Sequence, residues 1–142
     1  MLYPLGQDRF SDLQLGWSNL EAPLEEILQF RQRYLDAVAQ VATADVVILT
    51  LGYVETWFDK ELNLYLNSAP SAALIKRSPD RFEYRVLSYS DILDGLNQLY
   101  DLLLKHRKKP LKFLVTVSPV PLLTTFRDMD VLVANAYSKS AR

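Results

Sequence analysis

Residues 45–57 constrain the fold of this chain more than any other stretch. The segment Asp-Val-Val-Ile-Leu-Thr-Leu-Gly-Tyr-Val-Glu-Thr-Trp begins as an apolar, largely β-branched run and stops at Gly52. A second run, Lys-Phe-Leu-Val-Thr-Val-Ser-Pro-Val-Pro over residues 112–121, breaks in the same way at a Ser-Pro turn. Continuous apolar runs of this length are typical of strands buried on both faces of a parallel sheet. Ligands of open α/β sheets bind at the carboxyl ends of the strands, so the residues just after both runs are site candidates.

Helical periodicity surrounds the two predicted strands. One helix is predicted to start at Pro23 and to run to Val41, with apolar residues spaced by three and four. A second helix begins near Ser88, which has capping-box spacing to Asp91, and ends in the basic run before Pro110. The order strand, helix, strand predicts a βαβ crossover. The start of a third helix is expected in residues 130–142.

The organisation expected from these elements is a single α/β domain over residues 1–142. Residues 1–21 show no sustained period and are expected to form an irregular arm, and residues 22–142 an α/β core. Short strands are expected at residues 62–66 and 82–87, within an insertion beside the site. Two core strands and three helices are too few for a finished doubly wound domain. We therefore expect an incomplete domain from a longer protein or, alternatively, a small variant completed by self-association.

Composition excludes several classes of function. The chain has no cysteine, which excludes disulfides, thiolate zinc sites and a cysteine nucleophile. A net charge of −1 provides no field that favours nucleic acid or an anionic membrane. No apolar run is long enough for a membrane span and the N-terminus lacks signal-peptide features, so we expect a cytoplasmic protein. Phosphate loops, dinucleotide fingerprints and metal-ligand spacings are missing, so neither a cofactor nor a metal is expected.

Three segments together resemble the GSCFA-domain family, a bacterial group related to the SGNH (GDSL-like) hydrolases. They are Thr50-Leu-Gly52 with Glu55-x-Trp57, then residues 116–121 (Thr-Val-Ser-Pro-Val-Pro), then residues 131–139 (Val-Leu-Val-Ala-Asn-Ala-Tyr-Ser-Lys). The resemblance covers roughly residues 20–142. It implies a three-layer α/β/α, flavodoxin-like fold with a parallel sheet. By analogy it implies a serine-dependent esterase or deacylase acting on an acylated carbohydrate or lipid.

The resemblance also implies which catalytic groups this sequence lacks. SGNH enzymes use a serine nucleophile near the N-terminus and a histidine base near the C-terminus. Their oxyanion donors are the backbone of that serine, a glycine and an asparagine. The family's Gly-Ser-Cys-Phe-Ala motif is not present, and His106 lies in the basic end of the predicted second helix. Gly52-Tyr-Val-Glu55 resembles the third SGNH block, Gly-x-Asn-Asp, with Val54 at the asparagine position. This chain alone is therefore expected to be inactive. Either a different donor replaces the asparagine, or the chemistry differs.

Each candidate in the strand-end turns has a functional and a structural interpretation. Gly52 either lets the backbone approach a substrate or simply ends a strand. Glu55 either orients a loop or catalytic group, or is a helix cap or surface carboxylate. Ser118 either contacts the substrate or shapes the turn with Pro119, and it is not a nucleophile candidate because no base is near it in sequence.

The remaining candidates are expected to contact substrate. Tyr53 and Trp57 are assigned to substrate binding. Trp57 and Phe58 either form a pocket wall for an acyl or sugar ring or are ordinary core aromatics. Asn135, Ser138 and Lys139 share one face of the predicted last helix, which is either a polar patch toward the site or a solvated face. The expected partner is a small ester or carbohydrate, with no nucleic acid or membrane, and with possible self-association through the incomplete sheet. The alternative function is a non-catalytic binding or structural module.

Overall fold

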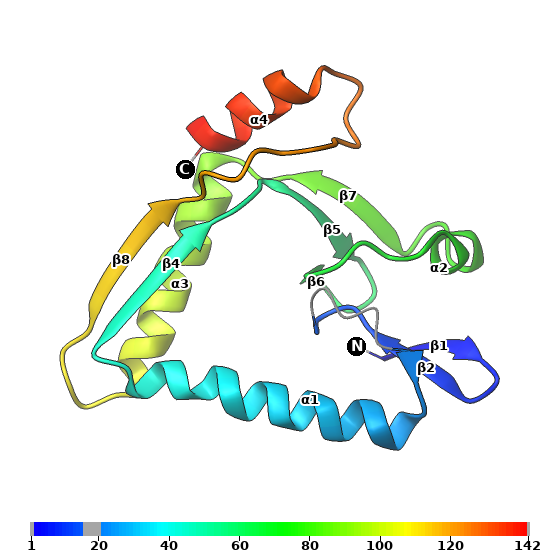
Figure 1. Ribbon diagram of the computed structural model, residues 1–142, viewed down its shortest axis with the longest axis horizontal. Helices are drawn as coiled ribbons and strands as arrows, with labels where there is room; N and C mark the ends of the chain where they lie inside the picture. The colour runs from blue at the N-terminus through cyan, green and yellow to red at the C-terminus, as the bar shows by residue number, and fades with distance from the viewer. Residues whose placement is uncertain (1, 16–20, 142) are drawn as a thin grey trace. The chain divides into compact units, whose positions relative to one another are not determined.

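The computed structural model describes residues 2–15 and 21–141 (Figure 1). Helices and strands are interspersed through this part of the chain, which confirms the predicted α/β class. The three-layer flavodoxin-like arrangement and the single domain stay predictions. The described chain consists of two compact units. Unit 1 comprises Met1–Val38 and Thr56–Arg85, and unit 2 comprises Ala39–Glu55 and Val86–Arg142.

An antiparallel sheet opens unit 1. It has the order β1 (Leu2–Gly6), β2 (Arg9–Asp12) and β3 (Glu21–Ala22). The turn between the first two strands has positive φ at Gly6, Gln7 and Asp8, namely 101°, 52° and 58°. Such turns match the twist of a hairpin, but they normally carry Asn-Gly or Asp-Gly, so this one gives a weak sequence signal. The expected irregular arm is therefore wrong for residues 2–12, and residues 16–20 lie outside the described part.

A second sheet completes unit 1 with the order β6 (Leu64–Leu66), β5 (Glu55–Asp59) and β7 (Phe82–Val86). The expected strands near residues 62–66 and 82–87 are confirmed, whereas β5 and the short helix α2 (Ala72–Arg77) are new. The core of the unit joins both sheets through side chains that are at most 8% exposed: Tyr3, Leu13, Leu66, Leu74 and Phe82. Helix α1 (Leu24–Ala39), also as expected, carries Arg31, which is ion-paired with Asp12 of β2.

Unit 2 contains the predicted strand–helix–strand core. After the 3-10 helix η1 (Gln40–Thr43), β4 (Val46–Leu51) pairs in parallel with β8 (Lys112–Val117), from Val46↔Lys112 to Leu51↔Val117. The connecting helix α3 (Tyr89–Lys105) begins with the complete Ser88–Asp91 capping box. Tyr100 of α3 contacts Phe113 of β8, with 5.8 Å between ring centroids. Helix α4 (Val131–Ser140) follows β8, and Asp130 caps it.

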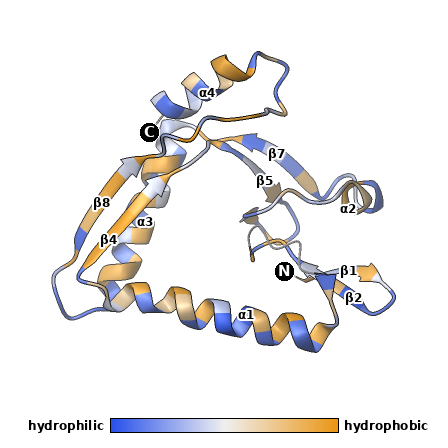
Figure 2. Ribbon diagram, viewed as in Figure 1, coloured by the Kyte–Doolittle hydropathy of each residue, from blue (hydrophilic) through white to orange (hydrophobic). Residues whose placement is uncertain are grey.

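The parallel pair is apolar along most of its length (Figure 2). Val47 is 8% exposed, on the face that also carries Phe113 in the parallel register. The opposite face carries Val46, Ile48 and Leu114, which are 51%, 63% and 52% exposed. The expected burial of both faces is therefore wrong in the described chain, where β4 pairs with β8 alone.

Candidate functional site

The carboxyl ends of β4 and β8 meet at one edge of the parallel pair in unit 2. The ladder continues one step beyond the strands, because the Ser118 N–H donates to the carbonyl oxygen of Leu51 at 2.9 Å. The hydroxyls of Thr50 and Thr116, paired in register, are 2.9 Å apart. Gly52 and Ser118 therefore lie beside one another at this edge, where the sequence placed them.

Helix α4 holds the loop that follows β8, residues 118–130, by two polar side chains. Asn135 accepts a 2.9 Å hydrogen bond from the Leu122 N–H through its Oδ1. Lys139 donates from Nζ to the carbonyl oxygens of Ser118 and Val120, the latter at 2.8 Å. This face of α4, which the sequence predicted to be either a polar patch toward the site or a solvated face, thus binds the loop backbone through Asn135 and Lys139.

The turn after β4 holds the same loop from its own side. The Tyr53 hydroxyl donates to the Pro121 carbonyl oxygen at 3.0 Å, and Lys139 Nζ lies 5.7 Å from the centroid of the Tyr53 ring. Glu55 accepts a 2.7 Å hydrogen bond from the Thr125 hydroxyl, which in turn accepts one from the Arg127 N–H at 3.0 Å. Tyr53 and Glu55 are therefore positioned to fix the loop.

Ser118 and His106 are placed at opposite ends of β8. Ser118 follows the strand, and its Oγ accepts the N–H of Val120 at 3.2 Å, as in a serine turn. His106 is the C-cap of α3 and comes before the strand begins. A six-residue strand spans about 20 Å, so these two side chains cannot form a nucleophile–base pair.

Val54 is fully buried, whereas Gly52 is half-buried and has open space at its Cβ position. Val54, at the position where the resemblance places an asparagine donor, is 0% exposed, and its carbonyl oxygen accepts the Leu87 N–H at 2.8 Å. Its side chain belongs to the core and contributes no donor. Gly52 is half-buried, and a Cβ added to it would meet no atom within 4 Å. Its backbone N–H makes no hydrogen bond within residues 2–15 and 21–141, so this donor is unpaired in the described chain.

Ser138 lies on the buried side of α4. It is 0% exposed, as is Ala134 one turn earlier, and its hydroxyl makes no hydrogen bond in the part of the chain that the structure describes. A hydroxyl in this position costs roughly 1–3 kcal/mol of stability. Ser138 therefore neither faces solvent nor helps to hold the loop.

Trp57 belongs to unit 1, unlike the other candidates. It packs against the core cluster of that unit, and its ring meets Tyr84 edge-on with centroids 5.7 Å apart. These contacts are those of a core aromatic, and its assignment to substrate binding stays a prediction.

Several contributors to the strand-end region were not singled out from the sequence. Thr125 and the Thr50–Thr116 pair are examples, and the guanidinium of Arg127 lies over the Tyr137 ring at 5.0 Å. The sequence did contain a signal for the threonine pair. Thr50 stands two positions before Gly52, and Thr116 stands two positions before Ser118, so the two threonines have equivalent places at the ends of the two strands. The Thr125 and Arg127 contacts depend on the path of the loop and had no such signal.

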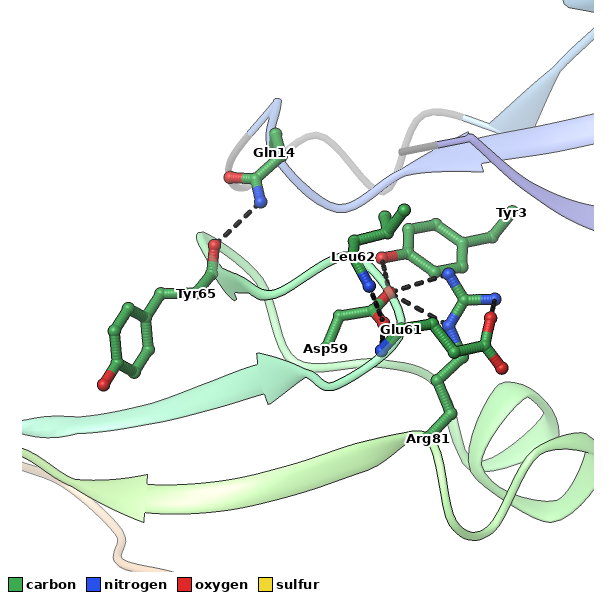
Figure 3. Close-up of polar contacts among 7 residues, drawn as sticks. All are labelled: Tyr3, Gln14, Asp59, Glu61, Leu62, Tyr65 and Arg81. Carbon is green, nitrogen blue, oxygen red and sulfur yellow. Dashed lines mark hydrogen bonds and ion pairs between the residues drawn. The ribbon is translucent and has the colours of Figure 1, made fainter.

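Three groups with shifted pKa values, Tyr3, Asp59 and Arg81, form a cluster in unit 1 around the fully buried Asp59 (Figure 3). Its Oδ2 accepts the Tyr3 hydroxyl at 2.6 Å and Arg81 Nε and Nη2 at 2.9 and 2.8 Å. Its Oδ1 accepts the N–H groups of Glu61 and Leu62. Burial acts to raise the pKa of Asp59, but the hydrogen bonds from Arg81 and Tyr3 outweigh it and lower that pKa.

The same contacts affect the partners of Asp59. Burial and the hydrogen bond to Asp59 raise the pKa of Tyr3, and the hydrogen bond to Asp59 raises the pKa of Arg81. Both groups are held in their protonated forms, and the carboxylate has its acceptor positions occupied. This cluster therefore joins β1, β5 and the start of β7 and has no group poised for proton transfer.

Comparisons with known proteins place this mixed α/β chain in a family. A model described as the GSCFA family matches residues 4–141, so the chain belongs to the GSCFA family. Neither the curated proteins nor the solved structures gave a match. No helix among the described residues has the length and apolar character needed to cross a membrane. In the same residues, no three His, Asp or Glu side chains gather in an arrangement that holds a metal ion.

Proposed function

We propose that unit 2 forms one wall of the active site of an SGNH-like ester hydrolase. Membership of the GSCFA family supports this assignment through the resemblance of Gly52-Tyr-Val-Glu55 to the third SGNH block. Under this proposal the serine nucleophile and the histidine base come from outside these 142 residues. The Gly-Ser-Cys-Phe-Ala motif is not in the sequence, and its single histidine, His106, lies at the opposite end of β8 from Ser118. The substrate class is an acylated carbohydrate or lipid.

The observation that carries the proposal is the N–H of Gly52. It lies at the carboxyl edge of a parallel strand pair and has no hydrogen-bond partner in the described chain, and the Cβ position of the same residue faces open space. Acyl transfer requires fixed N–H donors at the position where the oxyanion develops. The backbone N–H of Gly52 takes the role that a side-chain asparagine would have at Val54.

Contacts to the loop after β8 fix the position of the Gly52 N–H. Tyr53 in the turn and Glu55, the first residue of β5, hold the loop after β8 through Pro121 and Thr125. Lys139 binds the same loop from α4. Under this proposal, Tyr53, Glu55, Asn135 and Lys139 are positioning residues that keep the turn rigid, which an oxyanion donor requires.

Binding of a product-like carboxylate tests the proposal without requiring turnover. The isolated chain should leave 4-nitrophenyl acetate intact, so the readout is the amide spectrum of ¹⁵N-labelled protein titrated with butyrate. The carboxylate oxygens of butyrate accept a hydrogen bond where the oxyanion would, and the Gly52 amide resonance should shift on binding.

Two substitutions at one position provide the matched control. Gly52→Ala keeps the N–H and adds a methyl group to open space, so it should retain the response. Gly52→Pro removes an N–H that forms no ladder bond in the described chain. The φ of Gly52 lies outside the left-handed region and the preceding Leu51 is already extended, so we expect the fold to persist while butyrate binding is lost. An unmoved Gly52 amide, or equal binding by both variants, would favour the non-catalytic module instead.

A further inference from the structure

Unit 1 contains a cavity that is lined by both apolar and polar side chains. Its volume is about 560 Å³, within the range of small-ligand sites. The lining comes from β2, β3 and the segment between β6 and the end of α2, and includes Ser11, Leu13, Glu21, Asn67, Ser71 and Leu74. Three elements of one compact unit therefore surround it.

The floor of the cavity is apolar and fixed. Leu13 and Leu74 are 5% and 6% exposed and belong to the core cluster of the unit. The side walls are held by backbone contacts, because the Asn67 N–H donates to the Leu13 carbonyl oxygen and Asn67 Nδ2 to that of Gln14. The cavity thus has a preformed base and does not require a large rearrangement to accept a ligand.

Above this floor, several polar groups have unused hydrogen-bonding capacity within residues 2–15 and 21–141. The Ser11 hydroxyl, on a residue only 8% exposed, makes no hydrogen bond within the described residues. In the same part of the chain, the Glu21 carboxylate forms no ion pair, and the Asn67 side-chain oxygen accepts no hydrogen bond. The Ser71 oxygen accepts the Leu74 N–H, which leaves its hydroxyl hydrogen available. The wall therefore offers two donor hydroxyls and two strong acceptors.

We propose that this cavity binds a neutral saccharide. Sugar hydroxyls donate and accept at the same time, which matches a wall of serine hydroxyls, an amide oxygen and a carboxylate. The C–H faces of a sugar ring suit the Leu13–Leu74 floor. A purely apolar ligand would leave Ser11 and Glu21 desolvated without partners, which costs free energy. An anionic ligand would meet Glu21, and the described lining residues include no lysine or arginine.

The assay is a titration of the ¹⁵N-labelled chain with cellobiose, maltose and N,N′-diacetylchitobiose at millimolar concentration, with gluconate as the anionic control. At least one neutral disaccharide should shift the amides of Ser11, Asn67 and Ser71, and gluconate should not. Glu21→Gln removes a charge-assisted acceptor and Ser11→Ala a donor, and each should weaken binding by up to ~tenfold.

Glu25→Gln is the matched control, because Glu25 is an exposed residue of α1 that does not line this cavity. It should leave the saccharide affinity unchanged. The proposal is overturned if none of the three disaccharides shifts these amides, or if Glu21→Gln and Glu25→Gln have equal effects. Because Gly52 is not involved, this result is independent of the butyrate experiment.

Discussion

Replacing Asp59 by asparagine should be among the most destabilising conservative substitutions in unit 1. The side chain keeps its size but loses its charge at a position that is 0% exposed. It currently accepts five hydrogen bonds, of which two come from the Arg81 guanidinium and one from the Tyr3 hydroxyl. An amide has one acceptor oxygen in place of two, so at least one buried donor loses its partner.

The expected cost follows from these contacts. Removing one member of a buried ion pair costs about 3–5 kcal/mol. The lower end applies here, because the Arg81 side chain is 20% exposed and retains Glu61 at 2.9 Å. We therefore expect a loss of about 3 kcal/mol in the free energy of unfolding. With a urea m-value of about 2 kcal/mol/M, the midpoint should fall by roughly 1.5 M.

Urea denaturation followed by intrinsic fluorescence, to which Trp57 of the same unit contributes, measures this shift. Glu83→Gln is the control, because Glu83 pairs with Arg85 on the same unit in solvent-exposed surroundings, and it should leave the midpoint almost unchanged. Equal midpoints for Asp59→Asn and Glu83→Gln would refute the inference that the Asp59 cluster holds the two sheets of unit 1 together.

Two further predictions concern stability. The pKa of Asp59 is lower in the folded chain than its ordinary value of 3.8. The stability that its carboxylate contributes is therefore present above about pH 4 and is lost as pH falls through the folded pKa. The free energy of unfolding, measured as a function of pH, should show this loss in the native chain and a smaller loss in Asp59→Asn. Ser138→Ala removes a buried hydroxyl without a hydrogen bond in the described chain and should raise stability by about 1 kcal/mol; a clear loss of stability in thermal unfolding would show that the hydroxyl has a partner.

The sequence was sufficient for the elements whose signals are local. The strands β4 and β8 are continuous apolar runs, and α3 has a capping box at Ser88 and a basic end before Pro110. Their parallel pairing followed from the helix between them. The position of Gly52 and Ser118 at one edge of the sheet was therefore predictable from the sequence alone.

The parts that were missed depend on contacts between distant residues or on unusual backbone. Gln7 and Asp8 form a hairpin turn without glycine at either of these two positions, so β1 and β2 gave no recognisable turn signal. Tyr3 and Asp59 are 56 residues apart, and no local pattern connects them. Tyr53 and Glu55 were predicted as site residues, while their contacts to Pro121 and Thr125 depend on how the loop folds back.

The central claim is that the backbone N–H of Gly52 is an oxyanion donor, and the butyrate titration of Gly52→Ala and Gly52→Pro tests it most directly. The account predicts that butyrate shifts the residue-52 amide of the native chain and of Gly52→Ala, and that Gly52→Pro folds but no longer binds. Unchanged amide positions in the native chain, or undiminished binding by Gly52→Pro, would contradict it.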